Sequence, residues 1–242
     1  MARLDLELLA RGLARSRSQA QALISAGQVR VDGTVVRRAA TTVPPAAVLE
    51  ARPDPYVSRG AHKLIGALDD LDLAVPARAL DAGASTGGFT QVLLERGCRR
   101  VVAVDVGTGQ LAEPLRSDPR VRLWERTNLR DLTLAHVDLQ PVDLVVADVS
   151  FISLTLLLRP LTAVTAPTGA LLLLVKPQFE VGRERLGPGG VVRQDNLRQE
   201  AVAGVAAGAA ELGWSVRSTV PSRVVGGTGN QEYFVLLARD VP

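Results

Sequence analysis

Lysine occurs at two positions in this 242-residue chain, Lys63 and Lys176, although lysine and arginine together number 28. Arginine can replace lysine in most contacts with phosphate and solvent, but its guanidinium cannot give up a proton near neutral pH. The two lysines are therefore candidates for positions where an ammonium must lose a proton or act as a compact charge. The alternative is that both are chance survivors of a bias toward arginine.

A glycine-rich segment, Asp81–Thr90, offers a place for a ligand. An apolar run at 78–80 precedes it and an amphipathic pattern at 91–97 follows it, which predicts strand, turn and helix at the start of a βαβ unit. The next apolar run, 101–104, ends in Asp105, whose carboxylate can accept hydrogen bonds from ribose hydroxyls. These features predict a cofactor that contains adenosine.

The spacing of the glycines narrows the choice of cofactor. Gly83 and Gly87 are separated by three residues, whereas a dinucleotide fingerprint needs G-x-G-x-x-G and a P-loop needs Gly-Lys-Ser/Thr. The segment instead resembles the first motif of S-adenosylmethionine (SAM)-dependent methyltransferases. An acid and free backbone N–H groups suit the zwitterionic end of that cofactor. The alternative is a tight turn without a ligand.

Three further apolar runs, at 121–124, 143–148 and 170–175, are continuous rather than alternating. Such runs are typical of strands buried on both faces of a parallel sheet. Ligands of these sheets bind beyond the carboxyl ends of the strands, so the polar residues there should share one crevice. We therefore predict a Rossmann-like α/β domain with a seven-stranded, mostly parallel sheet. The residues that we expect to bind SAM are Asp81, Gly83, Ala84, Ser85, Thr86, Gly87, Gly88, Phe89, Asp105, Val106, Asn128, Leu129, Asp148 and Val149.

Other elements complete this domain. A helix is predicted from Ser58, as its N-cap, to Leu68, with Lys63 at one edge. Lys176 directly follows the 170–175 strand, and Glu232 stands at the head of the last strand. The remaining elements are expected as helices at 154–166 and 196–212, strands at 214–220 and 233–238, and a glycine-rich lid or substrate loop at 180–192.

The first 48 residues predict a separate small unit. A helix at 4–10, a second helix at 17–26 and a hairpin at 28–36 that turns at Asp32-Gly33 follow in order. This order and the sequence Val29-Arg-Val-Asp-Gly resemble the S4 RNA-binding domain. The alternative for its arginines is a solvated surface. The residues that we expect to contact RNA are Arg3, Arg15, Ser16, Arg17, Gln28, Arg30 and Arg59.

Four prolines between residues 44 and 55 mark a change in composition that indicates a linker. We therefore expect an S4-like RNA-binding domain at 1–50, a linker at 51–57 and a SAM-dependent methyltransferase domain at 58–242.

The amino-acid composition limits which other partners, cofactors and cellular locations are possible. The net charge of +3 and the isoelectric point of about 9.6 leave a polyanionic partner open. A single cysteine, Cys98, excludes intrachain disulfides, and two distant histidines give little basis for a metal site, so we expect none. The charged N-terminal segment lacks a signal peptide, and the most apolar stretch, 154–175, is broken by arginine, prolines and glycine. We expect a soluble, cytoplasmic protein without stable membrane association.

Several longer motifs together resemble the haemolysin A (TlyA) family. They are Ser58-Arg-Gly-Ala-His-Lys, Asp81-Ala-Gly-Ala-Ser-Thr-Gly-Gly-Phe, Asp148-Val-Ser-Phe-Ile-Ser, Lys176-Pro-Gln-Phe-Glu and Gly229-Asn-Gln-Glu-Tyr. The resemblance spans essentially the whole chain. It implies an S4 domain joined to a methyltransferase domain similar to FtsJ/RrmJ, 2′-O-methylation of cytidines in ribosomal RNA of both subunits, and a monomer. The linker Arg52-Pro-Asp-Pro-Tyr departs from the aromatic linker motif that the family leads us to expect.

The resemblance also implies a catalytic Lys-Asp-Lys-Glu tetrad, formed by Lys63, Asp148, Lys176 and Glu232. A ribose hydroxyl is a poor nucleophile unless it loses its proton as it attacks the sulfonium methyl, and a lysine can be tuned to accept that proton. We expect Lys176 to be the base. Lys63 would be the neighbouring cation that helps it to lose a proton, and the two carboxylates would orient the lysines and the hydroxyl.

Three other functions stay open at this point. A membrane-active haemolysin would need an amphipathic or spanning segment, and none is visible. A non-catalytic RNA-binding assembly factor would not need the intact tetrad. A methyltransferase of proteins or small molecules would have no use for the S4-like unit.

Overall fold

The computed structural model describes residues 2–14, 16–51 and 54–239, which divide into two compact units at 1–55 and 56–242. The start that we predicted for the linker, Ala51, belongs to strand β5 of the first unit. Pro44 and Pro45 precede that strand. The composition therefore changes before the first unit ends, because the segment from 42 to 51 returns to pair with earlier strands.

The small unit contains the predicted helices and hairpin. Ser16 caps the second helix, since its side chain accepts a hydrogen bond from the backbone N–H of Gln19. The hairpin turns where Asp32 and Gly33 have φ of +48° and +79°, the conformation that a two-residue turn of this kind needs. The elements are β1 (Ala2–Arg3), α1 (Leu4–Ala10), α2 (Arg17–Ser25), β2 (Val29–Val31), β3 (Thr34–Val35), β4 (Thr42–Val43) and β5 (Leu49–Ala51).

The large unit is built on a seven-stranded sheet in the order β11-β12-β10-β9-β6-β7-β8. Six of these strands run in the same direction, and β12 runs opposite to them, because it pairs antiparallel with both β10 and β11. This confirms the predicted mostly parallel sheet. The strands are β6 (Arg78–Ala82), β7 (Arg100–Val104), β8 (Val121–Trp124), β9 (Val142–Ala147), β10 (Thr165–Val175), β11 (Trp214–Pro221) and β12 (Tyr233–Arg239).

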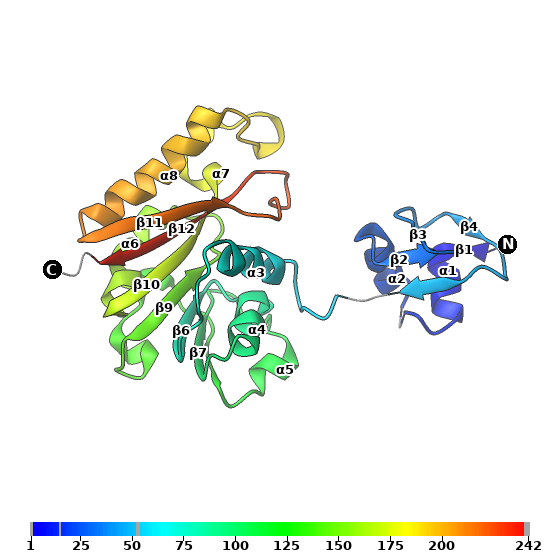
Figure 1. Ribbon diagram of the computed structural model, residues 1–242, viewed down its shortest axis with the longest axis horizontal. Helices are drawn as coiled ribbons and strands as arrows, with labels where there is room; N and C mark the ends of the chain where they lie inside the picture. Colours follow the sequence, from blue (N-terminus) through cyan, green and yellow to red (C-terminus); the bar gives the residue numbers. More distant parts are fainter. Residues whose placement is uncertain (1, 15, 52–53, 240–242) are drawn as a thin grey trace. The chain divides into compact units, whose positions relative to one another are not determined.

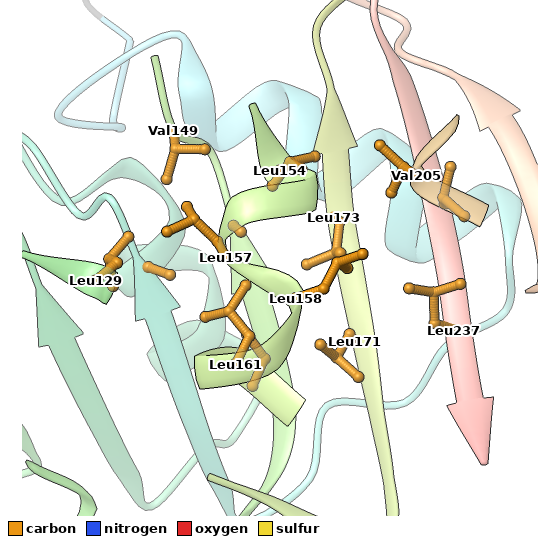
Figure 2. Packing of buried hydrophobic residues seen from close by; sticks show 14 of the residues in the cluster. Leu129, Val149, Leu154, Leu157, Leu158, Leu161, Leu171, Leu173, Val205 and Leu237 are labelled. Carbon is orange, nitrogen blue, oxygen red and sulfur yellow. The ribbon is translucent and has the colours of Figure 1, made fainter. Parts of the chain in front are cut away.

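Helices cover both faces of this sheet (Figure 1). One face packs against α3, α4 and α5, and the other against α6 and α8. Figure 2 shows part of the second layer, where Leu158 and Leu161 of α6 lie beside Leu171 and Leu173 of β10. The helices are α3 (Gly60–Asp70), α4 (Gly88–Glu95), α5 (Glu113–Arg116), α6 (Leu158–Ala163), α7 (Pro177–Glu180) and α8 (Asp195–Ala210), with short 3-10 helices η1 (Leu129–Asp131), η2 (Leu134–Val137), η3 (Leu154–Leu156), η4 (Arg183–Arg185) and η5 (Pro188–Gly190).

Chain order reverses at β6. From this strand the chain proceeds outward through β7 and β8 on one side, then returns to β9 and continues through β10 on the other. Such a switch leaves a crevice beyond the carboxyl ends of the central strands, which is where ligands of open α/β sheets bind. The sheet therefore places the residues after β6, β7, β9 and β10 around one opening.

Several elements differ from the sequence predictions. The helix predicted at 154–166 is divided into η3 and α6, which ends at Ala163. Ser58 is not the N-cap of α3, which begins after Arg59 without a side-chain cap. Its hydroxyl instead occupies the space that a Cβ on Gly88 would need, so it packs against the start of α4. Strand β10 begins at Thr165 rather than Ala170, with an irregular register between them. The segment after Lys176 forms α7, a helix that the sequence analysis missed.

Among the described residues, no helix is both long and apolar enough to cross a membrane.

Candidate active site

Two adjoining pockets lie in the crevice at the ends of the central strands. The larger has a volume of about 700 Å³ and the smaller about 300 Å³. Gly83 and Ser85 of the glycine-rich turn line both, as do Asp148 and Ser150 after β9. The two spaces are therefore parts of one site, and the loop that carries Asp148 lies at their boundary.

The larger pocket contains Asp105 and Asn128, two of the residues that we expected to bind the cofactor. Asp105, after β7, accepts hydrogen bonds from the backbone N–H groups of Ser85 (2.8 Å) and Gly107 (2.7 Å). Each carboxylate oxygen keeps a second lone pair for a ligand hydroxyl. Asn128 caps η1 through a 3.0 Å bond from the N–H of Arg130. The other predicted cofactor residues in this pocket are Val106, Leu129 and Val149.

The smaller pocket is bounded by the turn and by the start of α3. Gly83 has φ of +88°, and a Cβ there would lie 2.8 Å from the carbonyl oxygen of Asp148. A side chain at this position is excluded because the turn passes so close to the loop after β9. Besides the three that line both pockets, the predicted cofactor residues in this pocket are Ala84, Thr86, Gly88 and Phe89.

Two predicted cofactor residues fall outside the described lining of both pockets, Asp81 and Gly87. Gly87 packs against Leu111 and Leu115. Asp81 is fully buried, and its Oδ2 accepts a 2.7 Å hydrogen bond from the Thr90 hydroxyl. Within the described part of the chain, its Oδ1 has no hydrogen-bond partner. Burial raises the pKa of Asp81 to about 7, against the lowering effect of the Thr90 bond, and repulsion from Asp148 adds to the increase.

Two ion pairs lie at the smaller pocket. Lys176 Nζ lies 2.6 Å from Asp148 Oδ1 and also donates to the Ser150 hydroxyl at 2.8 Å. Lys63 Nζ, from α3, lies 2.6 Å from Glu232 Oε2. Lys176 is 7% exposed and Glu232 is 2% exposed. Both lysines are thus held by carboxylates in largely buried positions, where an ion pair needs close geometry to offset the loss of hydration.

The structure brings all four predicted tetrad residues to this region. Lys63, Asp148 and Lys176 line the smaller pocket, and Glu232 reaches the site through Lys63. A Cβ on Gly226 would lie 2.6 Å from Glu232 Oε1, so a side chain at 226 would displace the carboxylate. Each lysine has its own carboxylate partner, an arrangement that the sequence did not predict.

Comparisons with known proteins fit this geometry. Residues 56–239 match the family model for the FtsJ-like methyltransferase, and residues 2–49 match that for the S4 domain. The chain is 53% identical over 240 residues to the 16S/23S rRNA (cytidine-2′-O)-methyltransferase TlyA of Mycobacterium tuberculosis, covering 98% of this chain and 89% of that protein. This chain belongs to the TlyA family.

Two further relatives support the same family. YqxC of Bacillus subtilis, whose name describes an rRNA methyltransferase, is 38% identical over 238 residues, covering 97% of this chain and 85% of the relative. A solved structure from Streptococcus thermophilus, titled as a hemolysin, superposes with a TM-score of 0.77 at 38% identity, covering 100% of this chain and 90% of the other. This TlyA-family protein is therefore a methyltransferase with an S4 domain before the catalytic unit.

Several arginines predicted to contact RNA make bonds within this TlyA-family chain. Arg3 and Arg17 each lie 3.0 Å from the buried Asp5 carboxylate. Hydrogen bonds from Arg3 and Gln21 hold the pKa of Asp5 well below its usual range. Arg30 is exposed and donates to the Gly33 carbonyl at 2.7 Å.

The other predicted RNA contacts are placed differently. Arg59 is exposed and lines the smaller pocket of the catalytic unit. Gln28 is partly buried just before β2, and Ser16 has the capping role described above. Arg15 lies outside the described residues. Arg59 is thus the predicted RNA contact that the structure places at the smaller pocket, beside the predicted tetrad.

Several polar or aromatic residues that line the site were not assigned by the sequence analysis, among them Ser150, Gln110 and Phe151. Ser150 and Phe151 lie inside the motif Asp148-Val-Ser-Phe-Ile-Ser, which was the available signal. Phe151 is 91% exposed, unusual for a phenylalanine, and has φ of +66°. Among the described residues, no group of three His, Cys, Asp or Glu side chains could hold a metal ion.

Proposed function

We propose that this protein transfers the methyl group of SAM to the ribose 2′-hydroxyl of a cytidine in ribosomal RNA, with Lys176 as the general base. The observation that carries the proposal is the position of Lys176. Its buried ammonium is held by Asp148 and Ser150 where the adenosine-sized pocket meets the smaller pocket. The name of the M. tuberculosis relative supports cytidine as the acceptor and the RNAs of both subunits as substrates.

The residues of the larger pocket fit SAM. Asp105 would accept hydrogen bonds from the cofactor ribose, and Leu129 and Val149 would contact the adenine. The unpartnered Oδ1 of Asp81 fits a nearby ammonium, the charge that the amino-acid end of SAM carries. When bound, SAM supplies an electrophilic sulfonium methyl group.

Lys176 would act on the acceptor hydroxyl. The ammonium first passes a proton to solvent, and the neutral amine then accepts the 2′-hydroxyl proton as the oxygen attacks the methyl carbon. Asp148 and Ser150 fix Nζ, so the base stays in one position relative to both pockets. Holding the attacking oxygen in line with the methyl carbon can supply much of the rate enhancement. Lys63 and Glu232, held as a second pair, would orient the acceptor ribose.

Residues around both pockets support RNA as the methyl acceptor. Arg59 is exposed at its rim and can neutralise a phosphate. Phe151 presents an exposed ring beside the larger pocket, and single-stranded bases stack on such rings. The S4 domain adds a second RNA-binding unit. We propose that the protein acts as a cytoplasmic monomer on ribosomal subunits.

The test is methyl transfer from radiolabelled SAM to purified 30S subunits, 50S subunits and free ribosomal RNA, with Lys176→Ala beside the wild type. We expect label in the ribose of cytidine, abolished by Lys176→Ala and retained by Arg96→Ala, which alters an exposed ion pair with Asp69. Transfer to a protein or small molecule instead would redirect the proposal to another acceptor. SAM binding without transfer to any RNA would contradict it.

A further inference from the structure

Two motifs that contribute catalytic residues also carry polar residues without a role so far. Asp148 opens a motif that ends in Ser153, and Lys176 opens a motif that ends in Glu180. The structure joins their far ends as well as their near ends. Glu180 Oε2 accepts a 2.5 Å hydrogen bond from the Ser153 hydroxyl, and its Oε1 accepts a 2.9 Å bond from the backbone N–H of Leu154.

The contacts between the two motifs follow in chain order. Lys176 binds Asp148 and Ser150, as described above. The ring of Phe179 lies 5.3 Å from that of Phe151, centroid to centroid. Glu180 then closes the far end of the loop. The loop that lines both pockets is therefore fixed to the Lys176–Glu180 segment at three successive places.

The backbone of the loop needs this fixation. Phe151 has φ of +66° and projects a ring that is 91% exposed. A non-glycine residue persists in such a conformation only where the surrounding structure holds it. Because the Lys176 contacts precede Phe151 and the Glu180 contacts follow it, the loop is fixed on both sides of the strained residue. Loss of the Glu180 contacts would free one side.

The Glu180 carboxylate has no evident use other than these bonds. It is partly buried, and burial raises its pKa. The charged groups that share its small cavity, Arg185 and Glu200, form an ion pair with each other. A carboxylate withdrawn from water without a cation costs free energy unless it accepts hydrogen bonds. The bonds to Ser153 and Leu154 supply that compensation.

We propose that Glu180 is a positioning residue for methyl transfer, which fixes the 148–154 loop and thereby sets Asp148 and Lys176. This inference rests on the proposed function and adds a residue outside the tetrad. Glu180 acts through Ser153 and Leu154. It is not itself among the residues that line the two catalytic pockets, whereas its partner Ser153 lines the larger one.

The test measures steady-state methyl transfer by Glu180→Ala, Ser153→Ala, the double variant and Glu180→Gln. We expect Glu180→Ala to lower kcat at least tenfold and to change the KM for RNA less than threefold. Ser153→Ala should lower kcat about threefold to tenfold, and the double variant should be no slower than Glu180→Ala, since both remove one linkage. Glutamine can accept from Leu154 and donate to the Ser153 oxygen, so Glu180→Gln should recover kcat to within threefold of wild type.

Folded sites are counted by the stoichiometry of S-adenosylhomocysteine binding, which should stay the same in every variant. A fall in stoichiometry that matches the fall in kcat would overturn the positioning role, as would a kcat for Glu180→Ala within twofold of wild type. The positioning role would also be overturned if the effects of Glu180→Ala and Ser153→Ala on kcat multiplied in the double variant. It would be overturned as well if Glu180→Gln did not recover kcat. Wild type is measured beside these variants, and a wild type without RNA methylation would refute the proposed function itself.

Discussion

Lys176 Nζ and Asp148 Oδ1 lie 2.6 Å apart, although the two residues follow different strands, β10 and β9. These strands are parallel neighbours in register, with Leu173 opposite Ala147. A residue just past the end of each therefore projects into the same space. The pairing of the two charges follows from the sheet itself, and Ser150 gives the ammonium a second fixed partner.

Replacing Lys176 by arginine separates charge from basicity. The guanidinium keeps a positive charge beside Asp148 but cannot accept a proton near neutral pH. We expect single-turnover methyl transfer to fall by about 10²-fold or more, the usual contribution of a general base, while S-adenosylhomocysteine affinity changes less than threefold. Turnover near the wild-type rate would show that another group takes the proton.

The Lys63–Glu232 pair should be needed for stability as well as for orientation. Its side chains are only 12% and 3% exposed, so Glu232→Gln leaves a largely buried ammonium without its counter-charge. We expect the free energy of unfolding to fall by about 3 kcal/mol. Asp69→Asn is the matched control, because the Asp69–Arg96 pair is exposed and should contribute less than about 1 kcal/mol. Equal effects in urea melts would contradict this difference.

Much of the fold could be predicted from local patterns. Continuous apolar runs identified the central parallel strands, and the chemistry of Ser16 and of Asp32-Gly33 located a helix cap and a hairpin turn. The strands β4 and β5 could not be predicted in the same way. They are short and depend on pairing with β1 and β2, partners far away in sequence.

The residue types at the site could be predicted from the sequence, but the contacts between those residues could not. Sequence order identified Asp105, Asp148 and Lys176 as strand-end residues. It could not show that Lys63 pairs with Glu232, 169 positions away. Nor could it show that Asp81 bonds to Thr90 and is not among the residues that line the two pockets. Those facts depend on how α3 and the turn pack on the sheet, which no local pattern encodes.

Asp105 offers a test of the cofactor pocket. Its carboxylate already orients the turn through Ser85 and the following loop through Gly107, and it faces the larger pocket. Asp105→Asn removes the charge and one acceptor, so we expect about a tenfold loss of SAM affinity, or roughly 1.4 kcal/mol. Calorimetric titration measures this loss. Asp143→Asn, an exposed acid at the other end of β9, should bind SAM as the wild type does.

Arg59 should contribute to RNA affinity through charge alone. Because it is exposed at the smaller pocket, Arg59→Ala should weaken RNA binding similarly for all sequences and reduce the slope of log affinity against log salt by about one. Filter binding across a salt series gives that slope. Arg96→Ala should leave the slope unchanged, and an equal reduction in both variants would show a general charge effect.

The buried Asp81 should make stability depend on pH. Its folded pKa is raised to about 7 by burial, whereas an unfolded aspartate titrates near about 3.9. Between these values the unfolded chain has lost a proton that the folded chain keeps, so wild-type stability should fall as pH rises from about 4 to about 7.

The variant Asp81→Asn lacks this titrating carboxyl group, so its free energy of unfolding should not show this decrease with pH. Relative to Asp81→Asn, the wild type should lose on the order of 3 kcal/mol between pH 5 and pH 8, measured by urea melts. Asp143→Asn is the control, and its curve should run parallel to the wild type. Saturation with S-adenosylhomocysteine should reduce the wild-type loss, because its ammonium would favour the ionised carboxylate at the unpartnered Oδ1. A wild type that keeps the same stability difference from Asp81→Asn at both pH values would show that Asp81 titrates normally.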